Sequence, residues 1–155
     1  MEVIVLSRAK AKKYSYCEHK LKSAIISIND IEQDFINFNN NKDNNIRGVI
    51  KLKFDDVEDG YGVITELQAK QIATFVKFWK DKVDRFIVHC HAGISRSAGC
   101  AAAIMKYIDN DDRGIFNNSE YIPNMTVYRL VLTELMCSRE AINNERHNQT
   151  ASREV

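Results

Sequence analysis

The sequence predicts a single α/β domain in which helices flank a central, mostly parallel β-sheet, and three observations support this fold class. First, a chain of 155 residues is long enough to bury one sizeable hydrophobic core. Second, short apolar segments typical of buried strands alternate with longer segments whose apolar residues recur at helical spacing. Third, residues 85–90 (RFIVHC) contain a continuous apolar run, a pattern typical of the centre of a parallel sheet.

Two strand candidates lie within the first thirty residues. Residues 2–7 (EVIVLS) and 23–30 (SAIISIND) are short and rich in β-branched side chains, which favours buried strands. The basic segment between them is compatible with either a helix or an irregular crossing. Residues 37–45 (NFNNNKDNN) are polar and rich in asparagine, which predicts a loop tip.

Alternation predicts a third strand over residues 47–56 (RGVIKLKFDD). Ile50, Leu52 and Phe54 fall on one side of an extended chain and two lysines fall on the other, as in a half-buried strand. A loop with two glycines follows over residues 57–63.

The strongest helix signal covers residues 65–83. Thr65 and Gln68 have the spacing of a capping box at its start. Apolar residues at helical spacing predict the face that packs on the core, and we interpret Trp79 as part of that core and not as a substrate platform. The predicted stripe consists of Leu67, Ile72, Phe75, Val76, Trp79 and Val83.

Two further helices are expected in the last third of the chain. Residues 97–108 are rich in small side chains that permit close packing on the sheet, residues 110–114 (NDDRG) predict a turn, and a last helix follows over residues 124–142. The end of the chain is polar. We therefore expect one domain over residues 1–142 and a polar tail over residues 143–155.

Composition argues against several classes of protein. The formal net charge is only +1, which gives no broad electrostatic footprint for nucleic acid or membrane. No stretch approaches the roughly 18 apolar residues of a membrane span, and the first apolar run is too short, with its basic residues on the wrong side, for a signal peptide. The four cysteines show no C-x-x-C spacing, so we expect thiols in a reducing, cytoplasmic setting.

Residues 86–100 (FIVHCHAGISRSAGC) place chemically active side chains in a sharp turn between a strand and a helix. Gly93 allows backbone angles closed to other residues and Ala92 leaves space, so several N–H groups can point inward as an anion-binding nest. The helix N-terminus adds free N–H groups and partial positive charge. Arg96 supplies two parallel donors for a tetrahedral oxyanion. The loop is therefore shaped for phosphate or sulfate.

Cys90 lies at the base of this predicted cup. Electropositive surroundings lower a cysteine pKa from about 8.5 to roughly 3.5–7.5. A thiolate beneath a phosphoryl group is placed for in-line attack that forms a cysteinyl phosphate. Ser97 can donate a hydrogen bond to the sulfur and make it a better leaving group, and His89 can orient the loop from beneath.

The segment HCHAGISRSAG resembles the signature H-C-x-x-G-x-x-R-S/T of the cysteine-based protein tyrosine phosphatases. The chain is most similar to their compact dual-specificity, or tyrosine phosphatase-like, branch, over roughly residues 47–135. The resemblance implies hydrolysis of phosphomonoesters, mainly protein phosphotyrosine and also phosphoserine or phosphothreonine, through a cysteinyl-phosphate intermediate and without a metal or organic cofactor. It implies Cys90 as the nucleophile. The residues implied to bind the substrate are His91, Ala92, Gly93, Ile94, Ser95 and Arg96.

The resemblance also implies a catalytic aspartate roughly 30 residues before the nucleophile, at the end of an h-x-h-x-D run. Residues LKFDD fit this run with Asp56, which also lies on the same side of the predicted strand as Phe54. Asp55 is the runner-up, Asp59 is third, and Glu58 is expected to be solvated. A correctly placed acid is typically worth ~10²–10⁴-fold in rate.

Residues 121–130 (YIPNMTVYRL) are similar to the P-N segment that precedes the family's last helix. Asn124 is therefore expected to brace the loops around the cup, to cap the helix, or both. The tyrosine-bearing recognition loop of larger members has no equivalent here, which implies a shallower pocket. The phosphate loop also lacks the lysines of inositol-phospholipid phosphatases. The expected substrate is a phosphorylated protein or a small phosphomonoester, and neither nucleic acid nor a membrane is an expected partner.

Two alternatives concern the cysteines and histidines. A metal site is disfavoured because His89, Cys90 and His91 are adjacent, and consecutive strand residues point to opposite faces, while no ligand cluster has zinc spacing. A redox pair with Cys100 is disfavoured because that residue is expected to be small and buried against the sheet. The remaining two cysteines are expected to be packing residues: Cys17 and Cys137.

Two further alternatives have the same phosphate loop but a different function. A binding module without turnover would have lost the cysteine, the arginine or the acid, and the sequence has candidates for all three. An RNA 5′-phosphatase would need a basic groove, for which the near-neutral net charge gives no support. The sequence therefore favours a phosphatase.

Overall fold

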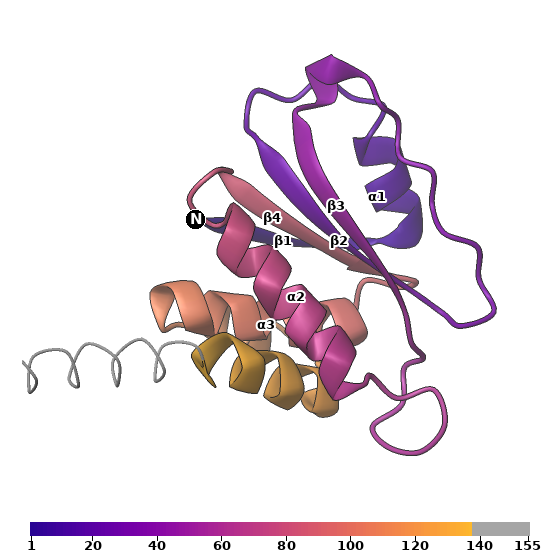
Figure 1. Ribbon diagram of the computed structural model, residues 1–155, viewed down its shortest axis with the longest axis vertical. Coiled ribbons are helices and arrows are strands. Elements are labelled where there is room, and N and C mark those ends of the chain that lie inside the picture. Colours follow the sequence, from indigo (N-terminus) through magenta and orange to yellow (C-terminus); the bar gives the residue numbers. More distant parts are fainter. Residues whose placement is uncertain (138–155) are drawn as a thin grey trace, which may run out of the picture.

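Four parallel strands form one central sheet in the computed structural model, which describes residues 1–137 (Figure 1). The strand order is β1-β4-β2-β3, and every neighbouring pair is parallel. This confirms the predicted α/β class. The strands are β1 (Glu2–Ser7), β2 (Ser23–Asn29), β3 (Ile46–Lys53) and β4 (Arg85–Cys90).

Helices cover both faces of the sheet. Helix α1 lies on one side, whereas α2, α3 and the helix over residues 125–137 lie on the other (Figure 1). The main hydrophobic core fills the space between the sheet and the second group. Because β2 and β4 are central, both of their faces are buried, which explains their nearly continuous apolar sequence. The helices before residue 125 are α1 (Arg8–Tyr14), η1 (Lys42–Asn44), α2 (Glu66–Trp79), α3 (Arg96–Asp109) and α4 (Arg113–Phe116).

Helix α2 confirms part of its prediction and corrects part of it. The Thr65 hydroxyl accepts from the backbone N–H of Gln68, whose side chain accepts from the backbone N–H of Thr65, so the capping box is present. The helix ends at Trp79, four residues early. Residues 80–82 form a turn, in which the N–H of Lys82 donates to the Trp79 carbonyl three residues back instead of continuing the α-helical pattern. Leu67 was wrongly placed in the core stripe, since it is 66% exposed.

Trp79 packs on the core as predicted. It is partly buried against the core, and its indole lies against β3 at Gly48, where a Cβ atom would approach the ring to 2.5 Å. A side chain at Gly48 would therefore displace the indole. This contact joins the end of α2 to the edge strand of the sheet.

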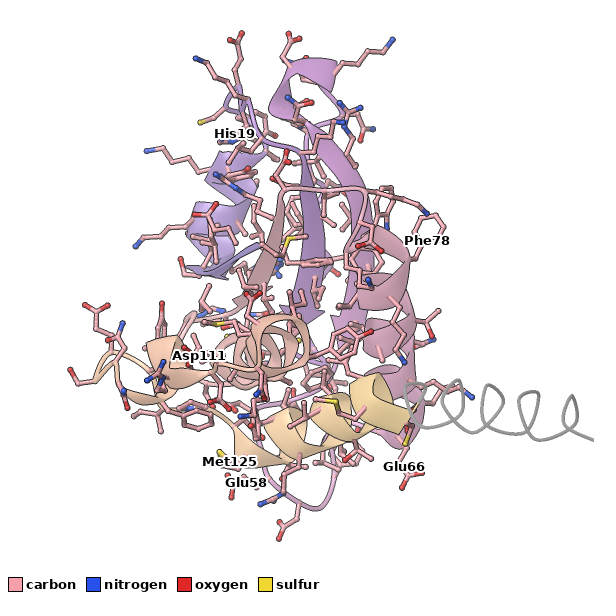
Figure 2. All side chains as sticks on the ribbon, turned by 90° about the vertical axis from the view of Figure 1, so that its left-hand side faces the viewer. His19, Glu58, Glu66, Phe78, Asp111 and Met125 are labelled. Carbon is pink, nitrogen blue, oxygen red and sulfur yellow. The ribbon has the colours of Figure 1, made fainter. Side chains whose placement is uncertain are left out.

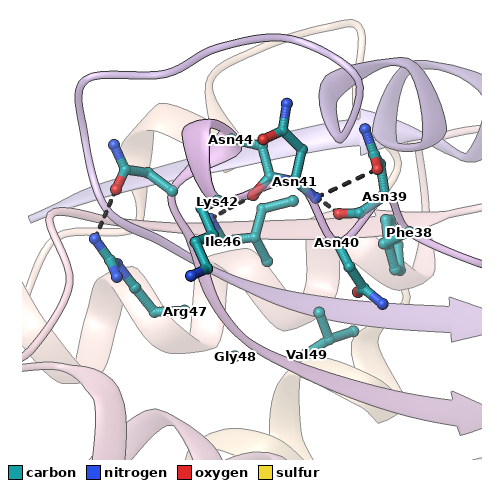
Figure 3. Close-up of a pocket in the computed structure, with 11 residues that line it drawn as sticks. Phe38, Asn39, Asn40, Asn41, Lys42, Asn44, Ile46, Arg47, Gly48 and Val49 are labelled. Carbon is teal, nitrogen blue, oxygen red and sulfur yellow. Dashed lines mark hydrogen bonds between the residues drawn. The ribbon is translucent and has the colours of Figure 1, made fainter.

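The asparagine-rich segment is a loop, as predicted, apart from the short helix η1. The sequence did not indicate that the Asn44 side chain is buried. The Asn44 amide donates to the carbonyls of Ser15 and Asn39, and its oxygen accepts from the N–H of Ile46. Figure 3 shows that Asn39, Asn41 and Asn44 gather around a polar pocket next to β3.

The predictions for the end of the chain have mixed outcomes. Helix α3 matches the predicted helix, and the predicted turn is shortened because α4 begins at Arg113. Helical residues 125–137 agree with the start of the last predicted helix. Its predicted end and the tail over residues 143–155 lie outside the described residues. Within the described part, no helix is long and apolar enough to cross a membrane.

The cysteines divide into two buried and two exposed thiols, all four of them free. Cys90 and Cys100 are buried, the second completely, as predicted for a small packing residue on α3. Cys17 and Cys137 are exposed, so their prediction as packing residues is wrong.

Candidate active site

The loop over residues 91–95 joins the end of β4 to the start of α3 at the carboxyl edge of the sheet, where ligands of parallel α/β folds bind. Gly93 has a φ angle of +72°, and a Cβ atom there would lie 2.7 Å from the backbone of Leu6 and Ser7. Glycine is therefore required twice, by the backbone conformation and by the close approach to β1.

Neighbouring segments hold the carbonyls of this loop from outside. The carbonyl of His91 accepts from the N–H of Arg8, that of Ile94 accepts from the N–H of Ile122, and that of Ser95 accepts from the N–H of Asn124. With these carbonyls engaged outward, the loop is free to direct N–H groups inward, as the N–H of Gly93 does toward the sulfur of Cys90.

Cys90 is only 2% exposed, yet its surroundings favour the thiolate. The N–H of Gly93 lies 3.3 Å from Sγ, and the hydroxyl of Ser97 lies 3.0 Å from Sγ. Burial by itself would raise the pKa of this thiol. Hydrogen bonds from the side chain and backbone of Ser97 and from the backbone of Gly93 and Ile94 outweigh burial and hold the pKa below its ordinary value.

A buried polar network lies beneath the loop. His89 Nδ1 lies 3.2 Å from the Cys90 carbonyl, and Nε2 lies 2.6 Å from the hydroxyl of Ser27. Burial lowers the pKa of His89 to about 4, so the imidazole is neutral at pH 7, donates through Nδ1 and accepts through Nε2. The Asn29 amide donates to Ser27, and Arg8 donates to Asn29 Oδ1 at 2.6 Å. Of this network only His89 was predicted from the sequence.

The Arg96 side chain is buried beside the cavity and only partly paired. Its Nη1 donates to the carbonyl of Phe54 at 2.8 Å, and its Nη2 forms an ion pair with Asp30 Oδ1 at 2.6 Å. Its Nε has no hydrogen-bond partner. A buried donor without a partner is costly, so this edge of the guanidinium is suited to an external acceptor.

Asp56 lies on the loop after β3 and faces the phosphate loop. Its Oδ1 accepts from the hydroxyl of Ser95 at 2.8 Å and from the side-chain amide of Asn124 at 3.0 Å. The same amide donates to the carbonyl of Val57. Asn124 Oδ1 also accepts from the N–H groups of Thr126 and Val127, so it joins the acid loop to the phosphate loop and caps the last helix.

The other acidic candidates are held elsewhere. Asp55 Oδ1 accepts from the N–H of Ile31, and its carboxylate packs against Gly62. Glu58 is exposed and lies beside Met125 (Figure 2), where its backbone carbonyl accepts from the hydroxyl of Thr126. Asp59 is exposed.

Most of the predicted site residues line one cavity of about 540 Å³. Cys90, Arg96 and Asp56 line it, whereas Asp55 and Gly93 do not. Sequence reasoning missed two lining residues, Asp30 and Ile122. The complete lining is Asp30, Asp56, Cys90, His91, Ala92, Ile94, Ser95, Arg96 and Ile122.

His91 is exposed at this cavity, and its Nδ1 lies 2.8 Å from the side-chain amide of Gln33. Across residues 1–137 no group of three or more histidine, cysteine, aspartate or glutamate side chains is arranged to hold a metal ion. The cavity itself brings together a thiol of lowered pKa, a buried guanidinium and a carboxylate.

Comparison with known proteins supports the fold. No protein-family model matches the chain, and no curated protein matches it. Among solved structures, the chain is similar to PTPMT1, with 17% identity, a TM-score of 0.57 and coverage of 93% of this chain and 95% of that one. PTPMT1 is also described in complex with PI(5)P.

Two other similar structures have related names. The human tyrosine phosphatase-like serine/threonine/tyrosine-interacting protein has 22% identity and a TM-score of 0.51, with 79% of this chain and 78% of that one covered. The Yvh1 phosphatase domain from Chaetomium thermophilum has 16% identity and a TM-score of 0.50, with 90% of both chains covered. The chain thus has the fold of the tyrosine and dual-specificity phosphatases, as the resemblance implied. A fold alone does not decide between turnover and binding.

Proposed function

We propose that the chain is a cysteine-dependent phosphatase that hydrolyses phosphomonoesters, chiefly phosphotyrosine in proteins and also phosphoserine or phosphothreonine. The observation that carries this proposal is the Cys90 sulfur. It is buried, it receives hydrogen bonds from Gly93 and Ser97, and it shares a cavity with a guanidinium whose Nε is unpaired. A thiolate of lowered pKa beside oxyanion donors is suited to nucleophilic attack on phosphorus.

In the first step, the N–H groups of the loop and Arg96 hold the phosphoryl oxygens. The Cys90 thiolate attacks phosphorus, the bond from phosphorus to the ester oxygen breaks, and Asp56 donates a proton to the departing oxygen. The hydrogen bonds from Ser95 and Asn124 engage only Oδ1 of Asp56, which leaves Oδ2 for the proton.

In the second step, water attacks the phosphorus of the cysteinyl phosphate. Asp56 accepts the proton of that water, the sulfur–phosphorus bond breaks, and the thiolate departs with a hydrogen bond from Ser97. Inorganic phosphate then leaves the cavity. His89 supports the loop from beneath through the Cys90 carbonyl, and Asp55 supports the acid loop through Ile31.

The walls of the cavity favour a phosphate ester with an aromatic leaving group. Ile94 and Ile122 line the cavity and are 40% and 73% exposed. Apolar side chains at the mouth gain more from contact with a phenyl ring than with the short side chain of serine. The net charge of +1 favours a protein or small ester over nucleic acid or a membrane surface.

We assign this activity to a domain over residues 1–142, followed by a polar tail over residues 143–155. A cytoplasmic setting suits the reaction, because a reducing compartment keeps the nucleophilic cysteine as a thiol.

Hydrolysis of para-nitrophenyl phosphate in the presence of a chelator tests the proposal. The wild type should turn over, Cys90→Ser should be inactive, and Asp56→Asn should lose about 10²–10⁴-fold in kcat. Asp55→Asn is the matched control: it removes the adjacent carboxylate, which does not line the cavity, so its loss should be much smaller. If Asp56→Asn kept its kcat, the acid would instead be Asp55 or Asp59. A folded wild type that binds vanadate without turnover would instead be a binding module.

A further inference from the structure

The apolar surface of α2 is wider than the part that the core covers. Leu67 and Phe78 are 66% and 57% exposed, although both belong to a helix whose other apolar residues pack inward. They line a groove of about 520 Å³ between α2 and β3, to which Phe75 and Ile50 also contribute. An exposed apolar surface with polar residues at its rim is typical of an interaction site.

Strand β3 lies beside this groove at the edge of the sheet. Its start contacts the end of α2, where Gly48 meets Trp79. Its end contacts the start of α2, where the Gln68 side chain donates to the Lys53 carbonyl at 2.8 Å. Among the described residues, β3 pairs only with β2, and no loop forms a backbone hydrogen bond with residues 47–52. The outer edge of β3 therefore has backbone N–H and C=O groups open to a further strand.

We propose that this groove and the open edge of β3 together bind an extended segment of a partner protein, in which apolar residues alternate with acidic ones. An extended segment satisfies the backbone edge as an added strand. Because side chains of a strand alternate between its two faces, every second residue of the added strand lies on the face of Ile50 and packs against Phe75 and Phe78. The surface is separate from the active-site cavity, so the proposal does not depend on the proposed phosphatase activity.

The charges around the groove define the other residues of the partner. Lys51 and Lys53 project from the face of β3 opposite the groove. Lys70 lines the groove itself, and the ammonium of Lys82 lies 3.2 Å from the centre of the Phe78 ring. In the part of the chain that the structure describes, none of these lysines forms an ion pair. Since α2 has a single acidic residue and β3 has none, acidic side chains of a partner meet uncompensated positive charge.

The same lysines disfavour a second copy of this chain as the occupant. Pairing of two β3 edges would bring Lys51 and Lys53 of one chain against those of the other. Like charges on neighbouring strands are destabilising, and lysines on an edge strand are a common defence against self-pairing. Acidic residues at the facing positions turn this repulsion into attraction. The charge of β3 therefore selects a partner strand of different sequence.

The test measures binding of a fluorescein-labelled synthetic peptide, as long as β3 and with alternating valine and glutamate, by fluorescence anisotropy. Phe78→Ala should weaken binding by about tenfold or more, as for an aromatic anchor of an interface. Leu67→Ala should also weaken it, whereas the matched control Leu21→Ala, at an exposed leucine outside the groove, should not. Lys51→Glu should weaken binding by about threefold to tenfold, and Lys12→Glu, at an exposed position of α1, should leave it unchanged.

Hydrogen–deuterium exchange shows whether the bound peptide is an added strand. Binding should slow the exchange of backbone amides in residues 46–53, because the peptide hydrogen-bonds to the outer edge of β3. Turnover of para-nitrophenyl phosphate should be the same in all variants, since none of the substituted residues lines the active-site cavity. An inactive wild type that binds the peptide would therefore contradict the proposed function and support the docking surface.

Four results would overturn the inference. They are no binding of the glutamate peptide, equal binding of a control peptide with lysine in place of glutamate, binding without slower exchange in β3, and self-association of the wild type that Phe78→Ala abolishes. The last result would make the groove a dimer interface. Circular dichroism checks folding, and should Phe78→Ala fail to fold, Leu67→Ala decides: weaker binding supports the inference and unchanged binding contradicts it.

Discussion

Two polar clusters, the asparagine-rich segment and the residues around the phosphate loop, lie at opposite ends of the sheet and differ in how their hydrogen-bonding groups are satisfied. At the amino ends of β2 and β3, the asparagine-rich segment bonds to itself and to the backbone. The Asn44 side chain alone makes three such bonds, and Arg47 donates to Asn45. At the carboxyl end, Arg96 Nε is buried without a partner, and donors converge on the Cys90 sulfur.

This difference separates a structural cluster from a candidate ligand site. Polar groups that satisfy one another stabilise the local fold and have no further capacity for a ligand. Buried donors that converge on a cavity and keep an unsatisfied member retain that capacity. Both ends of the sheet have pockets lined by polar residues. The presence of a polar pocket therefore does not by itself distinguish a ligand site from a structural cluster.

Replacing one arginine at each end of the sheet should give the largest difference in kcat/KM between two matched variants. Arg96→Ala removes oxyanion donors and should lower kcat/KM for para-nitrophenyl phosphate by about 10²–10³-fold, the typical effect of losing one such donor. Arg47→Ala removes an exposed arginine at the amino end and should leave kcat/KM within about twofold. Steady-state kinetics on the two variants checks this, and comparable losses would remove the distinction between the two ends.

Two glycines with positive φ angles, one in the phosphate loop and one outside the cavity lining, sharpen the comparison. Gly93→Ala combines an unfavourable φ of +72° with a Cβ atom 2.7 Å from the β1 backbone. It should cost about 1–3 kcal/mol of stability and at least tenfold in kcat, because the loop must shift. Gly60→Ala has a similar φ of +77° but open space around the new Cβ, so it should cost less in stability. Chemical denaturation and kinetics measure both, and equal effects would show that the contact with β1 is unimportant.

Asn44→Ala should separate stability from activity at the amino end. It leaves the carbonyl of buried Ser15 and two partly buried backbone groups, the carbonyl of Asn39 and the N–H of Ile46, without their hydrogen bonds, at a cost of about 1–3 kcal/mol in the free energy of unfolding. The kcat of the folded fraction should stay unchanged. Asn40→Ala, at an exposed position of the same segment, is the control and should change neither quantity. A fall in kcat without a fall in stability would give this end of the molecule a functional role.

The contiguous parts of the fold and site could be predicted from the sequence. Strand β4, the loop and α3 follow one another in the chain, so the turn glycine and the spacing of Cys90 and Arg96 indicated their geometry. The preference for Asp56 over Asp55 came from the h-x-h-x-D run of the family that the chain resembles, and predicted strand parity agreed with it. Strand β3 ends at Lys53, before both residues and three residues earlier than predicted, and of the two only Asp56 lines the cavity.

The parts that depend on tertiary contacts could not be predicted. Asp30 directly follows a different strand, β2, and its place beside Arg96 depends on the order of β2 and β4 in the sheet. A polar pair, Asn29 and Asp30, at the end of an apolar strand was the available signal. Leu67 has the periodicity of a core residue. Periodicity does not reveal which residues of such a stripe are covered by neighbouring elements, and Leu67 is exposed.

The most direct test of the central claim is the ionisation of Cys90, measured as the pH dependence of its alkylation by iodoacetamide and followed by peptide mass spectrometry. Cys100 is the internal contrast, because burial raises the pKa of that thiol and it should stay unmodified. We predict that Cys90 reacts with a midpoint clearly below the ordinary thiol value of about 8.5. In Ser97→Ala the midpoint should rise by about one unit, since one hydrogen bond to the sulfur is lost. A midpoint at or above about 8.5 in the wild type would mean that burial outweighs the hydrogen bonds of the loop, and it would contradict the assignment of Cys90 as an activated nucleophile.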